Sequence, residues 1–174
     1  MKRIAIATFI IAGIASACTS SKKTSYTVSR DADSKILNGV VNRSIIENDT
    51  SFAWFKENMK YGTTNPAAIE AFKNNKDKFT IVVFGGTWCH DTQNLLPIFY
   101  RLVDKSGYPE KEITLIAVDR EKHTTTNLQD KYKVTNVPTF IVYNRAGAEV
   151  GRVVEYGKYN EIDKELGEIA AGIK

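Results

Sequence analysis

The residue best suited to chemistry is Cys89, one of two cysteines in this chain of 174 residues. It lies in the segment Gly85-Gly86-Thr87-Trp88-Cys89-His90-Asp91-Thr92. Apolar residues recur at helical spacing after it, which predicts that Cys89 lies in the first turn of a helix. Unpaired amide N–H groups and the positive end of the helix dipole favour an anion at this position. Cys89 is therefore expected to ionise more easily than a free cysteine and is a candidate nucleophile.

Two elements must position this cysteine. Residues 79–84 are β-branched and aromatic without a charge, which predicts a short strand buried on both faces, and two glycines end it. The helix that follows has an apolar face made of Leu95, Leu96, Ile98, Phe99, Leu102 and Val103. Pro97 lies inside this helix, where it removes one backbone hydrogen bond and is expected to kink the axis.

The pattern Trp88-Cys89-x-x-Thr92 after a buried strand, followed by Pro97 and by Val137-Pro138-Thr139, resembles the thioredoxin superfamily. The resemblance covers about residues 65 to 174 and implies the thioredoxin fold, an α/β fold with a central mixed sheet flanked by helices. Two positions depart from the family pattern. Thr92 replaces the second cysteine of Trp-Cys-x-x-Cys, and Val83 occupies the position where the family usually has a buried acid.

The resemblance also implies a substrate groove beside Cys89. In the family a cis peptide bond, here between Val137 and Pro138, exposes the backbone of residue 137 to an extended substrate, and Trp88 would shape the same groove. From the residues alone, Pro138 could instead be a proline at the first position of a strand, where its missing N–H costs little. Cis bonds are nearly confined to proline, which favours the interpretation that the family suggests.

The predicted function is monothiol thiol–disulfide exchange, of the isomerase or reductase type. A thiolate attacks a disulfide sulfur to give a mixed disulfide, which dithiol enzymes release with a second cysteine. Cys89 can begin this reaction, but an external resolving thiol or reductase must complete it. The expected substrate is an exported protein or a small-thiol disulfide, and we expect no cofactor.

Two neighbours are predicted to tune the thiolate. Thr92, three residues along the same helix face, is expected to donate a hydrogen bond to it. A protonated His90 close to the sulfur would favour the thiolate, and Asp91 would oppose it. From the sequence, His90 and Asp91 are equally compatible with solvated positions in the first turn of the helix.

Two other functions are also compatible with the sequence. Cys89, His90 and His123 could bind copper or zinc, since thiolate and imidazole are suitable ligands. Adjacent residues on a helix face different directions, however, so we predict no metal site. A thioredoxin-fold module that binds a protein partner without catalysis would explain the loss of the second cysteine. The presence of Trp88, Cys89 and Pro138 together favours exchange chemistry.

The first residues resemble a bacterial lipoprotein signal. Met1-Lys2-Arg3 is basic, residues 4–14 are apolar but too few to span a bilayer, and small residues precede Cys18. The resemblance implies cleavage before Cys18, lipidation of that cysteine and anchoring in the bacterial cell envelope, facing the periplasm or the cell surface. An ordinary secretory signal that ends near a cysteine is the alternative. Lipidation would leave Cys89 as the only free thiol in an oxidising compartment.

The predicted organisation is a signal peptide (1–17), a lipidated cysteine with a polar tether (18–47) and a thioredoxin-like domain (48–174). The polar, aperiodic residues 19–35 predict the tether, and scattered aliphatics in residues 36–46 could add an edge strand. Loss of the signal peptide would remove two cations and no acid, which lowers the formal net charge from +4 to +2. The charge therefore gives no indication of nucleic-acid binding.

The other elements of the domain follow from periodicity and from turn residues. An N-terminal helical extension ending near Tyr61 carries aromatic residues, among them Phe52 and Trp54, that are expected to form core, a docking surface or a wall of a substrate groove. The remaining predicted elements are a helix starting at Asn65-Pro66, a strand at 113–118, a short helix at 124–132, a hairpin of strands 140–143 and 149–154, and a final helix at 158–173.

Overall fold

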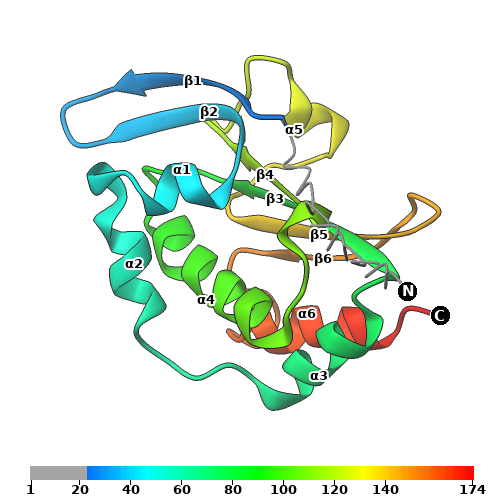
Figure 1. Ribbon diagram of the computed structural model, residues 1–174. Coiled ribbons are helices and arrows are strands. Elements are labelled where there is room, and N and C mark those ends of the chain that lie inside the picture. Colours follow the sequence, from blue (N-terminus) through cyan, green and yellow to red (C-terminus); the bar gives the residue numbers. More distant parts are fainter. Residues whose placement is uncertain (1–22) are drawn as a thin grey trace, which may run out of the picture.

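Six strands form one mixed sheet in the order β1-β2-β4-β3-β5-β6 (Figure 1). The structure is a computed structural model and describes residues 23–174, so the predicted signal peptide and Cys18 lie outside the described residues. The strands are β1 (Ser25–Arg30), β2 (Lys35–Val41), β3 (Phe79–Gly85), β4 (Ile113–Ala117), β5 (Thr139–Asn144) and β6 (Glu149–Val154). The helices are α1 (Arg43–Glu47), α2 (Ala53–Met59), α3 (Pro66–Asn75), α4 (His90–Ser106), α5 (Leu128–Lys131) and α6 (Ile162–Ala171), with 3-10 turns η1 (Thr50–Phe52) and η2 (Glu110–Glu112).

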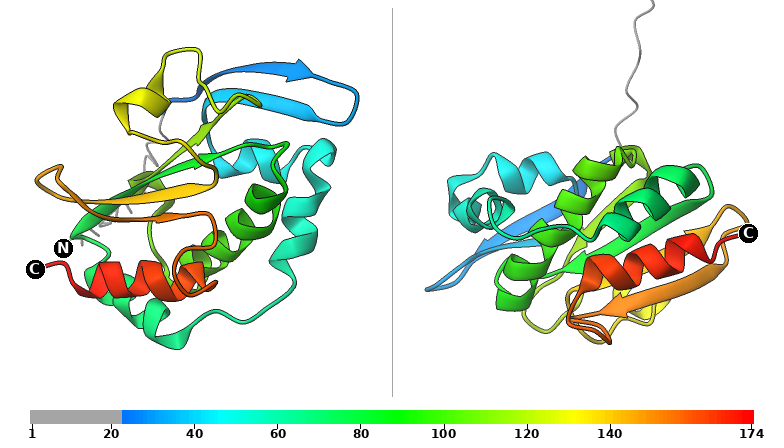
Figure 2. Two further views of the ribbon diagram at one scale, coloured as in Figure 1. Left: turned by 180° about the vertical axis from the view of Figure 1, so that it is seen from behind. Right: turned by 90° about the horizontal axis from the view of Figure 1, so that it is seen from below.

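Strand β3 is central, runs parallel to β4 and antiparallel to β5, and is buried on both faces as predicted. Ile81 and Val83 face the larger hydrophobic core, which lies between the sheet and helices α2, α3, α4 and α6. Val82 and Phe84 alternate with them and face a smaller core that includes Leu128 of α5. The right-hand view of Figure 2 shows the large helices gathered on one side of the sheet. The predicted α/β fold with a mixed sheet flanked by helices is confirmed.

The N-terminal part of the domain differs from the prediction. The polar tether predicted through residue 35 is wrong from Ser25 onward, because β1 and β2 form an antiparallel hairpin that joins the sheet. Residues 39–41 of β2 pair antiparallel with β4, so β2 lies inside the sheet and β1 forms the edge. All six residues of β1 are exposed, and the strand therefore lacks the alternation of apolar and polar residues that marks a half-buried strand.

Three predicted helices have different bounds in the structure. Helix α4 begins at His90, with Cys89 as its N-cap residue rather than within the first turn. The helix predicted at 124–132 is the single turn α5. Helix α6 begins four residues after the predicted start at Lys158, because the preceding segment turns through positive φ angles at Glu155, Gly157 and Asn160.

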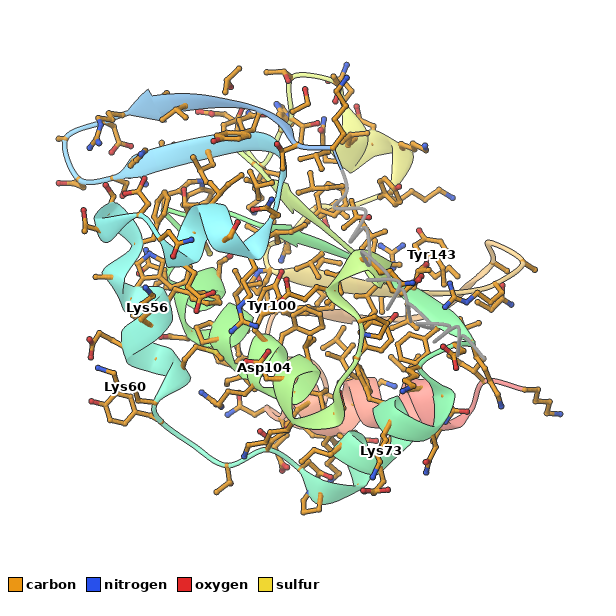
Figure 3. The ribbon with its side chains drawn as sticks, viewed as in Figure 1. Lys56, Lys60, Lys73, Tyr100, Asp104 and Tyr143 are labelled. Carbon is orange, nitrogen blue, oxygen red and sulfur yellow. The ribbon has the colours of Figure 1, made fainter. Side chains whose placement is uncertain are left out.

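Arg43 of α1 attaches the helical extension to α4. Its guanidinium forms an ion pair with Asp104 and lies 5.1 Å from the ring centroid of Tyr100. Figure 3 shows Tyr100 and Asp104 on the same helix. Burial raises the pKa of the Tyr100 hydroxyl above its usual range, so this ring stays neutral in the core.

Candidate functional site

Cys89 is half-buried at the start of α4, where the chain leaves β3 and enters the helix. Its backbone N–H donates to Gly86 O at 2.9 Å, and its carbonyl accepts from Gln93 N at 3.0 Å. The side chain points to the loop before β5, and Sγ donates a hydrogen bond to Val137 O at 3.4 Å. The sulfur therefore lies at the boundary between a helix N-terminus and the Val137-Pro138 segment.

The Val137–Pro138 peptide bond is cis, as the family pattern predicted. Pro138 O accepts a hydrogen bond from Glu155 N at 2.7 Å, which fixes the loop against the segment after β6. Among the described residues, none accepts a hydrogen bond from the Val137 N–H. The backbone of residue 137 thus presents a carbonyl to the sulfur and keeps an N–H without a partner. Val137 is only 2% exposed, however, so the predicted exposure of its backbone is not found.

The two glycines before the cysteine allow close packing of two side chains. A Cβ at Gly86 would lie 2.7 Å from the indole ring of Trp88, and one at Gly85 would lie 2.8 Å from Thr92 Cγ2. Real Cβ atoms do not approach other atoms this closely. The Gly-Gly pair is therefore required by the packing of the loop and does more than end the strand.

Thr92 makes a different contact from the one predicted. We expected its hydroxyl to donate to Cys89, but Oγ1 accepts a hydrogen bond from Gly86 N at 3.2 Å and the side chain is only 2% exposed. No hydrogen bond between Thr92 and the Cys89 side chain is present in the described structure. The helical period turns Thr92 toward the core, where it stabilises the loop.

Trp88 is fixed by contacts that the sequence did not predict. Its Nε1 donates to Val118 O at 3.1 Å, and the Arg120 guanidinium lies 5.5 Å from the centroid of its ring. Arg120 also forms an ion pair with Asp31, which lies after β1. The hydrogen bond to Arg120 lowers the pKa of the Asp31 carboxyl to about 2. The N-terminal hairpin is thereby linked to the tryptophan beside Cys89.

Thr87 provides a second link to the hairpin. Its Oγ1 accepts a hydrogen bond from Leu37 N at 3.3 Å and donates one to Lys35 O at 2.9 Å. Strand β2 pairs with β4 only from Gly39 onward, so these groups extend beyond the end of β4. The Thr87 hydroxyl therefore provides the hydrogen bonds that a neighbouring strand would otherwise provide to Leu37 N and Lys35 O.

Comparisons with known proteins agree with this geometry. A sequence model of the thioredoxin family matches residues 44–162, which is more than half of the chain. This chain belongs to the thioredoxin family.

Individual thioredoxin relatives match shorter stretches. A chloroplastic thioredoxin Y from Oryza sativa subsp. japonica is 27% identical over 77 residues, which cover 44% of this chain and 43% of the rice protein. A thioredoxin from Echinococcus granulosus is 30% identical over 78 residues, 45% of this chain and 66% of that protein. The chain thus spans less than half the length of the rice relative.

One solved structure supports the fold. A Pseudomonas aeruginosa protein of unknown function superposes with a TM-score of 0.54 at 16% identity, over 78% of this chain and 94% of that one. At this identity the similarity concerns the fold alone.

The first turn of α4 in this thioredoxin-family chain carries two further polar residues. Tyr156, which follows β6, donates a hydrogen bond from its hydroxyl to Asp91 Oδ1 at 3.1 Å. His90 is exposed and its side chain forms no hydrogen bond with the described residues, so its predicted catalytic role stays a prediction. Asp91 is therefore a fixed group and His90 a solvated one.

Neither a metal cluster nor a membrane-spanning helix occurs in the part of the chain that the structure describes. Within residues 23–174, no group of three or more His, Cys, Asp and Glu side chains is placed to hold a metal ion. His123 lies in a turn, where its backbone N–H donates to Asp119 Oδ1 at 2.8 Å. None of the helices among these residues is both long and apolar enough to cross a bilayer.

Sequence reasoning missed Thr87, Arg120, Asp31 and Tyr156 as residues of the site. A signal for Arg120 existed, because it follows β4, and the carboxyl ends of the neighbouring parallel strands β3 and β4 meet at one edge of the sheet. Asp31 has no comparable signal, since it lies in a polar stretch 89 residues from its partner Arg120.

Proposed function

We propose that this thioredoxin-family protein performs monothiol thiol–disulfide exchange through Cys89. The Cys89 thiolate attacks one sulfur of a substrate disulfide, the substrate S–S bond breaks, and the other sulfur leaves as a thiolate. A bond between Cys89 and the attacked sulfur replaces the one that was lost, so no net oxidation occurs. An external thiol then releases the product, because Thr92 supplies no second sulfur.

The position of the Cys89 sulfur carries this proposal. Sγ lies at the N-terminus of a 17-residue helix and 3.4 Å from the carbonyl of the residue before a cis proline. An extended substrate beside the sulfur could pair with the free Val137 N–H, which would orient its disulfide for attack. A cysteine that serves only packing requires neither this exposure nor this neighbour.

We also propose that the protein is exported and lipid-anchored through Cys18, in the bacterial cell envelope, facing the periplasm or the cell surface. The basic start, the short apolar stretch and the small residues before Cys18 support this proposal. Mass spectrometry of the mature N-terminus should find an acylated Cys18. Replacement of this residue in Cys18→Ser should release the protein from membranes, and an unmodified Cys18 would contradict the proposal.

The exchange reaction is tested with hydroxyethyl disulfide, a small neutral substrate. Intact-mass measurement should show a mixed disulfide on the full-length protein, assigned to Cys89 by peptide mapping and absent in Cys89→Ser. Thr92→Cys should restore a second thiol, so that the adduct no longer accumulates and two substrate thiols are released.

A binding module without catalysis is the second candidate, and the buried contact of Thr92 with Gly86 favours it. Thr92 stabilises the loop and takes no part in resolving an intermediate. If wild-type protein forms no adduct, and Cys89→Ser retains every partner that the wild type captures in cell extracts, the module is the correct assignment. Loss of even one of these partners in Cys89→Ser would instead support exchange.

A further inference from the structure

The sheet has two edges, and they differ in how open they are to a further strand. Strand β1 forms one edge and β6 forms the other (Figure 1). Every second residue of an edge strand directs its backbone N–H and C=O away from the sheet, where they can pair with another strand. Proteins usually prevent such pairing with charged side chains, proline or β-bulges at the edge.

Strand β6 carries such protective features. Glu149 and Arg152 place charges in the strand and form an ion pair with each other. Arg152 also donates to two backbone carbonyls of the segment after α5, at 3.2 Å each. The ladder between β6 and β5 shifts register between Val142 and Tyr143. These charges and this irregularity protect the β6 edge against the addition of a strand.

Strand β1 lacks these features, except for the charge of Arg30 at its end. Residues 25–29 contain neither a charge nor a proline. The ladder between β1 and β2 is regular from Ser25 to Arg30. All six residues of β1 are exposed, and no second strand pairs with β1 within residues 23–174. The Tyr-Thr-Val sequence at its centre has high β-propensity, so this edge is suited to pair with another strand.

Two exposed apolar side chains lie at the centre of the β1 edge. Tyr26 is 38% exposed and Val28 is 51% exposed. Val28 pairs with Leu37, which belongs to the larger core, so Val28 lies on the face of the sheet that carries the large helices. Tyr26 lies two residues away and therefore on the same face. A further strand beside β1 would cover both side chains.

We propose that β1 pairs antiparallel with β1 of a second copy of this chain, so that the two sheets join into one. Only residues whose backbone groups point outward can bond to each other, so the two-fold axis of this pair passes through a residue. An axis at Thr27 places Tyr26 of each copy opposite Val28 of the other. Aromatic and β-branched residues are favourable cross-strand pairs, and this register contains two of them.

The charges at the ends of β1 agree with the same register. It places Lys23 of each copy opposite Asp31 of the other, and Arg30 opposite Thr24, so that no like charges face each other. Lys23 has no ion-pair partner among the described residues, whereas Asp31 also pairs with Arg120 of its own chain. The edge of one copy is therefore complementary to itself in shape and in charge.

The test is sedimentation equilibrium of the full-length protein in a density-matched detergent. The wild type should show a monomer–dimer equilibrium, with more dimer at higher concentration. Val28→Lys removes both apolar pairs and should raise the dissociation constant of the dimer about tenfold. Val150→Lys is the matched control, because Val150 is a 40% exposed valine of β6 at the protected edge, and it should leave this constant unchanged.

Cross-linking tests the register, in full-length protein that carries Cys89→Ser. With the axis at Thr27, the Cα atoms of the two copies of this residue lie about 4.5 to 5.5 Å apart, within the range of a disulfide. Mild oxidation of Thr27→Cys should therefore give a covalent dimer, mapped to residue 27 by mass spectrometry. An axis at Val28 would bring Arg30 opposite Tyr26. Faster cross-linking of Val28→Cys than of Thr27→Cys would indicate that axis and overturn the register.

Two results would overturn the pairing itself. A wild type that stays monomeric would leave the β1 edge to strands of other proteins. Equal dissociation constants in Val28→Lys and Val150→Lys would show that a dimer forms through another surface. The inference goes beyond the exchange reaction, which needs only one copy. Val28→Lys should therefore react with hydroxyethyl disulfide at the rate of the wild type.

Discussion

The loop before Cys89 has two flanks that are built in different ways. The Val137-Pro138 segment forms the cis-proline flank, and the β1–β2 hairpin forms the hairpin flank. On the cis-proline flank, the internal contacts are local: Asn136 O accepts from Thr139 Oγ1, three residues away, and Asn136 Nδ2 donates to Glu155, 19 residues away. On the hairpin flank, the partners are 50 to 89 residues apart, as in the contacts of Thr87 with Leu37 and of Arg120 with Asp31. One flank is a compact turn of the domain, and the other is assembled from distant segments.

The flanks also differ in the groups that they present. The cis-proline flank presents backbone atoms of Val137 to the sulfur, a carbonyl that accepts from Cys89 Sγ and an N–H without a partner among the described residues. The hairpin flank presents side chains instead, and these are both charged and aromatic. The comparison indicates that backbone groups lie on one side of the sulfur and charged and aromatic side chains on the other.

Gly39→Ala should have the largest effect, and it acts on the hairpin flank. Gly39 has a φ of +122°, and a Cβ there would lie 2.4 Å from the backbone oxygen of Ser25. Backbone strain and this clash should lower the free energy of unfolding by about 3 kcal/mol, measured by urea denaturation.

Gly147→Ala in the β5–β6 turn is the control for Gly39→Ala. Gly147 also has a positive φ, +79°, but nothing lies within 4 Å of the position of its Cβ. Conformational strain alone should cost about 1 kcal/mol. Equal losses in the two variants would show that β1 is not held against β2 at Gly39 as described.

Much of the cis-proline flank could be predicted from the sequence, because short motifs specify it. Trp88-Cys89 and Val137-Pro138 are contiguous residues, and the buried strand before Cys89 has an apolar pattern of its own. The hairpin flank could not be predicted in this way. The exposed strand β1 has no alternating pattern, and a polar stretch such as Asp31–Ser34 does not reveal a partner far along the chain.

Thr92 shows a second limit of sequence reasoning. Its spacing from Cys89 correctly placed both residues at the start of one helix, but it did not determine which way the hydroxyl would point. Gly85 packs against Thr92, and the Thr92 hydroxyl accepts from the Gly86 N–H instead of donating to the sulfur. The Thr92 hydroxyl had two possible partners, and the packing of the folded chain determined which of them it binds.

Thr87→Val and Thr139→Val compare one buried threonine from each flank. Loss of the Thr87 hydroxyl leaves Leu37 N–H and Lys35 O without their partner, whereas loss of the Thr139 hydroxyl affects only Asn136 O. Thr87→Val should therefore lower the free energy of unfolding by about 2 kcal/mol and Thr139→Val by about 1 kcal/mol. Urea denaturation of both variants measures which one loses more stability. A larger loss in Thr139→Val would contradict the hydrogen bonds described between Thr87 and β2.

Tyr156→Phe tests the contact that connects the cis-proline flank to α4. The variant removes the hydrogen bond to Asp91 and a longer one that the hydroxyl accepts from Asn94 Nδ2 at 3.5 Å. The free energy of unfolding should fall by about 0.5 to 1 kcal/mol, because these groups are only half-buried. Tyr159→Phe is the control, since Tyr159 is exposed and its ring contact with Lys164 does not need the hydroxyl. A Tyr156→Phe variant as stable as Tyr159→Phe would mean that this contact adds nothing.

The smallest expected effect is the response of Trp88 to acid. Because the pKa of Asp31 is lowered from 3.8 to about 2 by Arg120, its ion pair is complete above about pH 4 and is lost as the pH falls through about 2. Release of Arg120 should change the contact of its guanidinium with the Trp88 ring. Trp54→Phe leaves Trp88 as the only tryptophan, so its fluorescence can report this change directly.

Two acidic residues must be separated in that experiment, because the hydrogen bond from Lys35 also lowers the pKa of Asp49 to about 2. In the Trp54→Phe background, Asp31→Asn should abolish the fluorescence transition centred at about pH 2, and Asp49→Asn should retain it. Far-UV circular dichroism has to stay constant over this range, so that unfolding does not imitate the local change. A transition that survives in Asp31→Asn would break the proposed link from the hairpin through Arg120 to Trp88, and the hairpin flank would then act on the site through Thr87 alone.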